Sequence, residues 1–284
     1  MGLHRIAVAV AVAAAAAALA SAAQAGTLDD IQKRGTIRLG YSETSPPFSF
    51  KSPQGEVGGY SVDLCKRVAA AIAQRVKAPG LKTEWVALTP ATRVEAVAMG
   101  NVDLECGTTT TSLARRERVE FSVPIFVDAS TLMGREAAAV SVAQLQGKTI
   151  AVAENTTTLG ALDRALARRG LKAEIVKTKT VAEGFEMLKA GKVDALASDR
   201  TVLVGTFYGS GGAQGLTVFA EDLSLEPYGL MLRRGDPDFR LAVDRTLAQV
   251  YRTEIDAVYN AWLQPLGKPT QPLLTMYLLN ALPD

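Results

Sequence analysis

The sequence of 284 residues contains a single histidine, His4, close to its amino terminus. If the N-terminal segment is removed, no imidazole is left. A Ser-His-Asp triad, a Cys-His pair and a zinc site made of histidines are then all excluded, because each needs an imidazole as base or ligand. We expect no catalytic residue, no metal ion and no cofactor.

An excess of one charge is also missing, since 31 lysines and arginines stand against 29 aspartates and glutamates. Proteins that bind nucleic acid or a membrane surface usually carry a one-sided charge, so neither partner is expected. The remaining composition, 48% hydrophobic and 21% charged residues, is typical of a globular protein. The length leaves room for two ordinary domains or one large one.

Only one long hydrophobic run is present, at residues 6–20, and it lies between the parts of a secretory signal peptide. The positively charged residues 1–5 precede the run, and Ala23-Gln24-Ala25 is a small-x-small cleavage site. The run is short for a membrane span, which needs about 20 residues, although an uncleaved anchor is the alternative. We predict cleavage before Gly26 and export of residues 26–284.

Cys65 and Cys106 are the only two cysteines. In an exported protein, an even pair of cysteines favours a disulfide over a metal site or a nucleophile. Such a bridge would stabilise the protein by about 4 kcal/mol in the chain-entropy model. Two buried free thiols are the alternative.

Strand and helix patterns alternate after the N-terminal segment. Hydrophobic periodicity predicts strands at 36–41, 81–86 and 102–106 and helices at 62–76 and 93–99. The order strand, helix, strand, helix, strand predicts a parallel sheet flanked by helices.

The same order recurs in the second half of the chain. Strands are predicted at 148–153, 173–177 and 193–197 and helices at 159–169 and 181–190. The chain therefore contains two similar α/β units.

The two units share a Gly-x-Val-Asp sequence, at 100–103 and 191–194, where a helix turns into a strand. Small polar or charged residues follow that strand in each unit, at 107–112 and at 198–199. Ligands of open α/β sheets bind at the carboxyl ends of the strands, so the two polar clusters are predicted to face a cleft between two lobes. The remaining predicted elements are a strand at 228–232 and helices at 236–251 and 254–263.

Five sequence motifs resemble those of the periplasmic solute-binding proteins of polar amino acid ABC transporters, the family 3 extracellular solute-binding proteins. The resemblance is closest to the glutamate/aspartate-binding branch, and it covers nearly the whole chain after the N-terminal segment. The motifs are Pro47-Phe48-Ser49-Phe50, residues 58–64 (GGYSVDL), residues 102–110 (VDLECGTTT), residues 115–122 (RRERVEFS) and Tyr228-Gly229.

The resemblance implies a two-lobed periplasmic-binding-protein fold of the venus-flytrap, type II kind, in which each lobe is a mostly parallel sheet flanked by helices. Lobe 1 would be discontinuous and comprise residues 26–127 and 225–284, with lobe 2 at 128–224. The chain would cross between the lobes near 126–130 and 221–227.

A free amino acid carries a carboxylate and an ammonium group, and burying both requires partners of both signs. The resemblance implies that Arg115 binds the carboxylate and that Asp199, at the end of a second-lobe strand, binds the ammonium. Arg115 could instead lie on a solvated helix face, and Asp199 could be an N-cap for the helix after Arg200.

Four threonines match ligand contacts of the family. Thr108 and Thr110 would add contacts to the ammonium group, through a carbonyl and a hydroxyl respectively. Thr156 and Thr157 would contact the carboxylate from the opposite lobe, where a helix begins. The alternatives are that Thr108 and Thr110 only form a turn at the end of a strand and that Thr156 and Thr157 only cap a helix. The sequence would be the same in either case.

Phe48 resembles the aromatic residue that covers the ligand, with core packing as its alternative. Arg93 resembles the arginine directed toward an acidic ligand side chain, with solvent exposure as its alternative. Two positions depart from the acidic branch, because Ser42 stands where many members have a second arginine and Val181 where they have a histidine. The preference for glutamate and aspartate should therefore be weaker than with a full basic pocket.

The function that the resemblance implies is a non-catalytic, monomeric receptor in the periplasm, which delivers a polar or acidic amino acid to ABC permease subunits in the inner membrane. Glutamate and aspartate are the first candidates for the ligand. The alternative is a periplasmic enzyme on the same scaffold, such as a cyclohexadienyl or arogenate dehydratase. Glu43 or Glu154 would then be its acid.

Overall fold

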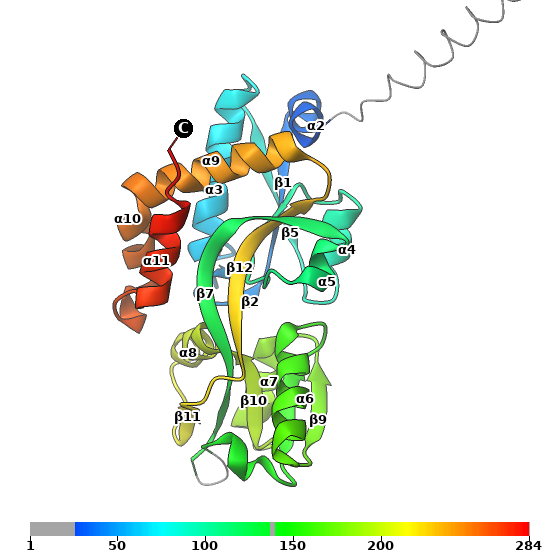
Figure 1. Cartoon of the computed structure of the whole chain (residues 1–284), viewed down its shortest axis with the longest axis vertical. Helices are drawn as coiled ribbons and strands as arrows, with labels where there is room; N and C mark the ends of the chain where they lie inside the picture. Colours follow the sequence, from blue (N-terminus) through cyan, green and yellow to red (C-terminus); the bar gives the residue numbers. More distant parts are fainter. Residues whose placement is uncertain (1–25, 137–139, 284) are drawn as a thin grey trace, which may run out of the picture.

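The computed structural model describes residues 26–136 and 140–283 as an elongated mixed α/β protein made of two parts (Figure 1). The predicted signal peptide, residues 1–25, lies outside the described residues. Within the described ranges, each helix is too short or too polar to span a bilayer. The predicted fold class is confirmed.

We call residues 26–127 and 225–284 the first lobe and residues 128–224 the second lobe, and this division itself stays a prediction. The first lobe forms the upper part of Figure 1. Its elements up to the first crossing are α2 (Thr27–Arg34), β1 (Thr36–Tyr41), β2 (Thr44–Ser45), β3 (Ser49–Lys51), β4 (Val57–Gly58), α3 (Tyr60–Arg75), β5 (Lys82–Ala87), α4 (Arg93–Ala98), β6 (Leu104–Glu105) and α5 (Leu113–Arg116).

The second lobe forms the lower part of Figure 1 and repeats the alternation of strands and helices. Its elements are η1 (Val142–Leu145), β8 (Thr149–Ala153), α6 (Thr157–Arg169), β9 (Glu174–Thr178), α7 (Val181–Lys189), β10 (Ala195–Asp199), α8 (Arg200–Gly209) and β11 (Leu216–Val218). The chain then returns to the first lobe and adds α9 (Pro237–Thr253), α10 (Ile255–Leu263), η2 (Gln264–Leu266) and α11 (Gln271–Asn280).

Two long strands, β7 (Val119–Arg135) and β12 (Ser224–Arg233), run through both lobes and pair antiparallel. They join the strands of both lobes in the order β5-β1-β6-β12-β7-β10-β8-β9, with β11 on β7. Within each lobe the other strands pair parallel as predicted, β5-β1-β6 in the first and β10-β8-β9 in the second. The two sheets are therefore one continuous sheet, which the alternation of elements did not predict.

The Gly-x-Val-Asp sequences have the same structural role in both lobes. Their aspartates lie before the strand, not in it, and each carboxylate accepts the backbone N–H of a neighbouring strand. Asp103 accepts from Arg38 at 2.7 Å, and Asp194 accepts from Thr149 at 2.9 Å. The predicted strand starts were therefore too early, because β6 begins at Leu104 and β10 begins two residues after Val193.

Several short elements were missed from the sequence, among them helix α2, the small sheet β2-β3-β4 and helix α11. Helix α3 begins after Gly59, whose φ of 125° suits glycine. A Cβ there would lie 2.2 Å from the carbonyl oxygen of Phe48. Because Gly59 has no side chain, the loop that carries Phe48 can pack tightly against the start of α3.

The predicted disulfide is confirmed, since Cys65 of α3 is bonded to Cys106, just after β6. Both cysteines are fully buried in the core of the first lobe. The bridge attaches α3 to the end of the strand that leads into the predicted binding residues 107–112.

Candidate functional site

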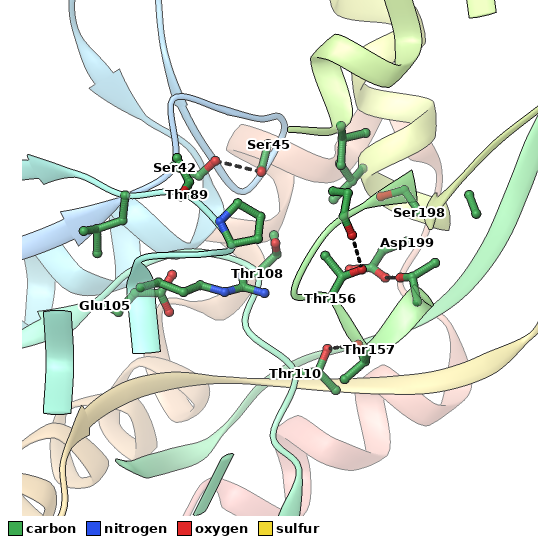
Figure 2. A pocket seen from close by; sticks show the side chains of 18 residues that line it. Ser42, Ser45, Thr89, Glu105, Thr108, Thr110, Thr156, Thr157, Ser198 and Asp199 are labelled. Carbon is green, nitrogen blue, oxygen red and sulfur yellow. Dashed lines mark hydrogen bonds between the residues drawn. The ribbon is translucent and has the colours of Figure 1, made fainter. Parts of the chain in front are cut away.

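A pocket lies between the two lobes, at the carboxyl ends of their parallel strands (Figure 2). Its first-lobe lining consists of Ser42, Ser45, Leu88, Thr89, Pro90, Arg93, Glu105, Thr108 and Thr110. Its second-lobe lining consists of Ala153, Thr156, Thr157, Thr158, Val181, Ala197, Ser198, Asp199 and Val202. Six of the eight predicted binding residues line it, and the other two, Phe48 and Arg115, do not.

Arg115 lies beside the pocket, in the short helix α5. The Ser112 hydroxyl caps this helix by accepting the N–H of Arg115. The guanidinium donates to the carbonyl oxygen of Thr110 at 2.7 Å and to that of Asn155, in the second lobe, at 3.4 Å. Burial and, to a lesser extent, the charge of nearby Arg93 lower the pKa of Arg115 to about 10. Arg115 therefore stays charged at neutral pH, and it is not on a solvated helix face.

Asp199 is the last residue of β10 and is almost completely buried. Its carboxylate accepts the Tyr228 hydroxyl at 2.6 Å and the Thr158 hydroxyl at 3.2 Å. Asp199 stands at the N-cap position of α8, but its side chain makes no capping hydrogen bond there, and Asp128 of β7 accepts the N–H of Thr201 instead, at 3.1 Å. The Asp199 carboxylate is therefore left for the pocket that it lines.

Burial and the neighbouring carboxylates of Asp128 and Glu226 together raise the pKa of Asp199 to about 7. Burial likewise raises the pKa of Asp128 to about 6. A cation bound beside Asp199 would lower the pKa of this carboxyl again, because an opposite charge favours the ionised carboxylate.

Glu226 of β12 is a buried acid that sequence reasoning missed. Its Oε2 accepts the hydroxyl of Thr110 at 2.6 Å and the hydroxyl of Thr157 at 2.7 Å, so that one carboxylate joins both lobes. Asp128 and Glu226 were both detectable in principle, since each is a charged residue inside an apolar strand segment. The sequence does not show that both segments are strands that cross between the lobes.

The hydroxyls of the predicted threonines have different hydrogen-bond partners. Thr110 and Thr157 donate to Glu226, and their hydroxyls lie 3.3 Å apart across the cleft (Figure 2). The Thr156 hydroxyl caps α6 by accepting the N–H of Leu159 and also donates to the carbonyl of Ala153. The capping alternative thus holds for Thr156, while Thr108 lines the pocket beside them.

Arg93 begins α4 and is 8% exposed, so the solvent-exposed alternative is wrong for this residue. Glu105 of β6 is 2% exposed and also lines the pocket, and sequence reasoning missed it. Burial raises the pKa of Glu105, while the positive charge of Arg93 opposes this rise. Ser42 and Val181 line the same pocket, so the two departures from the acidic branch do lie in it.

Phe48 is not at the pocket. Its ring is fully buried and packs edge to face against three aromatic rings, with centroid distances of 6.0 Å to Tyr60, 4.8 Å to Phe126 and 5.3 Å to Tyr228. The core-packing alternative therefore describes Phe48. Its contact with Tyr228 supports the residue whose hydroxyl holds Asp199.

Across residues 26–136 and 140–283, no group of three or more histidines, cysteines or acids has an arrangement that could hold a metal ion. The charged groups at the pocket are two arginines and the buried acids. This arrangement suits a small zwitterion, whose two charges need partners of opposite sign.

Comparison with known proteins agrees with this description. The chain is 33% identical over 251 residues to the L-glutamate/L-aspartate-binding protein of Pseudomonas aeruginosa, covering 87% of this chain and 81% of that one. It matches a structure of an ancestral arginine-binding protein bound to glutamine, with a TM-score of 0.72 and 27% identity over 81% of this chain and 98% of that one.

A second ancestral amino acid-binding protein, described as a precursor of cyclohexadienyl dehydratase, matches with a TM-score of 0.72 and 29% identity. The match covers 84% of this chain and all of that one. The model of the bacterial extracellular solute-binding proteins, family 3, matches residues 37–265. Because this match spans most of the chain, the protein belongs to family 3 of the bacterial extracellular solute-binding proteins.

Proposed function

We propose that this protein captures a polar or acidic α-amino acid between its lobes and delivers it to ABC permease subunits in the inner membrane. The observation that carries the proposal is the placing of opposite charges around one pocket. Arg115 supplies a half-buried cation from the first lobe, and Asp199 supplies a buried carboxylate from the second. The names of the relatives favour glutamate and aspartate as ligands.

The α-carboxylate of the ligand would bind Arg115, and its ammonium group would bind Asp199. Thr108 and Thr110 would add contacts to the ammonium group. The Thr157 hydroxyl donates to Glu226, so Thr157 would contact the carboxylate from the second lobe through its backbone N–H. Arg93 would face the ligand side chain, as its place in the lining allows. A guanidinium is suited to the first role because it can donate two parallel hydrogen bonds to a carboxylate.

Closure of the lobes follows from the same geometry. The Thr110 and Thr157 hydroxyls meet at Glu226, and Arg115 reaches the second lobe at Asn155. A ligand that contacts both lobes gains all of its contacts only in the closed form, so it shifts the equilibrium toward closure by its differential affinity.

Family membership places the protein among extracellular solute-binding proteins. We further propose that it is a periplasmic monomer and that cleavage occurs before Gly26. Intact-mass measurement of exported protein tests the cleavage, and retention of residues 1–25 would contradict it.

The dehydratase alternative is less well supported. It rests on the similarity to the precursor of cyclohexadienyl dehydratase, but neither Glu43 nor Glu154 lines the pocket. Glu43 instead accepts the Tyr41 hydroxyl and lies 3.7 Å from the ammonium group of Lys51. We expect no turnover of prephenate or arogenate by the purified protein.

The direct test is a thermal-shift screen of the common amino acids, followed by calorimetry of those that stabilise. A ligand at a hundred times its dissociation constant stabilises a protein by about 2.7 kcal/mol, which is easily measured. The proposal fails if no amino acid shifts the melting temperature.

A further inference from the structure

The first-lobe end of the pocket contains a positively charged side chain and an acidic side chain that do not form a direct ion pair. Arg93 and Glu105 are both buried and both line the pocket. Nε of Arg93 and Oε2 of Glu105 each have no hydrogen-bond partner among the described residues. A buried polar atom without a partner is costly, so a ligand that supplies partners for both atoms would be favoured.

The carboxylate of Glu105 is held in a narrow place. A Cβ on Gly107 would lie 2.2 Å from Oε1, so only glycine leaves room for this side chain. Figure 2 shows Glu105 on the first-lobe side of the pocket with Thr108, across from Thr156 and Asp199 of the second lobe. Glu105 therefore lies at the end of the pocket that is far from the ammonium partner, Asp199.

Two charged side chains face Glu105, and both are arginines. Arg93 of α4 acts on it most strongly and Arg115 of α5 less strongly, while the Thr109 hydroxyl and the Gly107 N–H are the nearby polar groups. The two strands that pair with β6 place uncharged residues opposite Glu105, Gly40 on β1 and Met231 on β12. The positive charges that act on Glu105 are therefore those of the two arginines.

The charged groups of the site have both signs before a ligand enters. Arg93 and Arg115 supply two positive charges, Glu105 and Asp199 are the acids that line the pocket, and the buried carboxylates of Asp128 and Glu226 lie near Asp199. A zwitterionic amino acid with an uncharged side chain adds no net charge to this site. An acidic side chain adds a buried negative charge that no remaining cation compensates, since Ser42 and Val181 also line the pocket without charge.

We propose that Glu105 determines the charge of the side chain that the pocket accepts. While Glu105 is ionised, the pocket selects an uncharged polar side chain, and a carboxamide suits it best, because its oxygen can accept from Arg93 and its NH₂ can donate to Glu105. An acidic side chain enters only together with a proton on Glu105. This proposal rests on the proposed function and names the ligand class of the same site.

The test compares glutamine with glutamate by calorimetry on the whole exported chain, from pH 5.5 to 8.5. Both ligands have the same α-carboxylate and ammonium groups, so the ratio of their dissociation constants cancels the titration of Asp199. In the wild type we expect glutamine to bind about tenfold more tightly than glutamate at pH 8, a difference that shrinks on acidification. Measured in two buffers of different ionisation enthalpy, glutamate should take up about one proton more than glutamine.

Glu105→Gln should shift the ratio toward glutamate by about tenfold and remove its dependence on pH. Glu95→Gln is the matched control, because Glu95 lies on α4 but is exposed and pairs with Arg118. The control should leave the ratio unchanged.

Three results would overturn the proposal. The first is a ratio of the glutamine and glutamate dissociation constants that does not change with pH in the wild type. The second is the same ratio in a folded Glu105→Gln protein as in the wild type. The third is binding of basic amino acids alone. In each case the amino acid-binding function survives. If no amino acid binds the wild type, the proposed function itself fails, and this proposal fails with it.

Discussion

The two walls of the pocket have different chemistry. The first-lobe wall contains Arg93 and Glu105 and adjoins Arg115, whereas Asp199 is the single charged residue of the second-lobe wall, among hydroxyl and apolar residues. In the proposed assignment, the partner of the ligand carboxylate, Arg115, belongs to the first lobe and the partner of its ammonium group, Asp199, to the second. Both ligand charges therefore meet these partners only when the two walls come together.

The lobes also differ in how they are held together. The disulfide between Cys65 and Cys106 fixes α3 to the pocket side of the first lobe. The second lobe contains no cysteine. The first lobe should therefore present a more rigid wall than the second.

The largest effect is expected from removing the cation that adjoins the first-lobe wall. Arg115→Ala should abolish detectable binding and leave the fold intact, because loss of one partner of a desolvated charge pair costs about 2 to 5 kcal/mol. Arg116→Ala is the control, since Arg116 is the exposed neighbour on the same helix. Calorimetry that gives wild-type affinity for Arg115→Ala would refute its role.

Removing the disulfide tests the difference in rigidity. The double variant Cys65→Ala/Cys106→Ala should lose about 4 kcal/mol of stability in the chain-entropy model, because 41 residues separate the two cysteines. The measurement is denaturant unfolding, combined with a thiol titration of wild-type protein under denaturing conditions. Two free thiols in protein isolated from the periplasm would contradict the bridge.

Removing the charge of the second-lobe wall should have a somewhat smaller effect. Asp199→Asn keeps the size of the side chain and an acceptor for Tyr228, so we expect a loss of about 2 to 3 kcal/mol in binding, the worth of a hydrogen bond to a charged group. Asp222→Asn is the control, since Asp222 is an exposed acid paired with Arg200. Equal affinities of Asp199→Asn and wild type would mean that the ammonium group binds elsewhere.

The raised pKa of Asp199, about 7, also predicts the pH dependence. Between about pH 4 and 7 the folded protein keeps a proton on Asp199 that the unfolded chain has released, so the stability without ligand should fall as pH rises through this window. A ligand ammonium needs the ionised carboxylate, so affinity for glutamine should fall as pH drops below 7. Melting temperatures with and without ligand at pH 5, 6.5 and 8 measure both trends, and tighter glutamine binding at pH 5 would contradict them.

The smallest effect is expected where the walls approach each other. A Cβ on Gly205 of α8 would lie 2.4 Å from the carbonyl oxygen of Pro46 in the first lobe. Gly205→Ala should therefore disfavour closure and weaken ligand affinity by about tenfold, or 1.4 kcal/mol. A Cβ on Gly209, near the end of the same helix, meets nothing within 4 Å, so Gly209→Ala should bind normally. Equal affinities of the two variants would show that the loop around Pro46 can move to make room for the added methyl group.

The predicted elements rest on local patterns, and these were largely sufficient for the order of strands and helices in each lobe. Residues 198–199 and 107–112 were expected at the strand ends, and most predicted site residues do line one pocket. The pairing of Cys65 with Cys106 was predictable because only two cysteines exist. Each of these inferences needs only neighbours in sequence or a count.

Burial and long-range pairing were beyond the sequence. Phe48 lies in the core because three aromatic rings from distant segments surround it. Asp128 and Glu226 lie beside the site because β7 and β12 cross side by side between the lobes.

By itself, then, the sequence determined the two α/β units, the charged residue types available for a ligand and the cysteine pair, since periodicity and composition are properties of the chain. Only the tertiary structure decided which charges share one buried pocket. In the folded protein, Asp128 and not Asp199 accepts the N–H of Thr201 in α8, and Glu105 lies near Arg93. The physical reason is that the cost of burying a charge depends on its neighbours in space, and those neighbours come from both lobes.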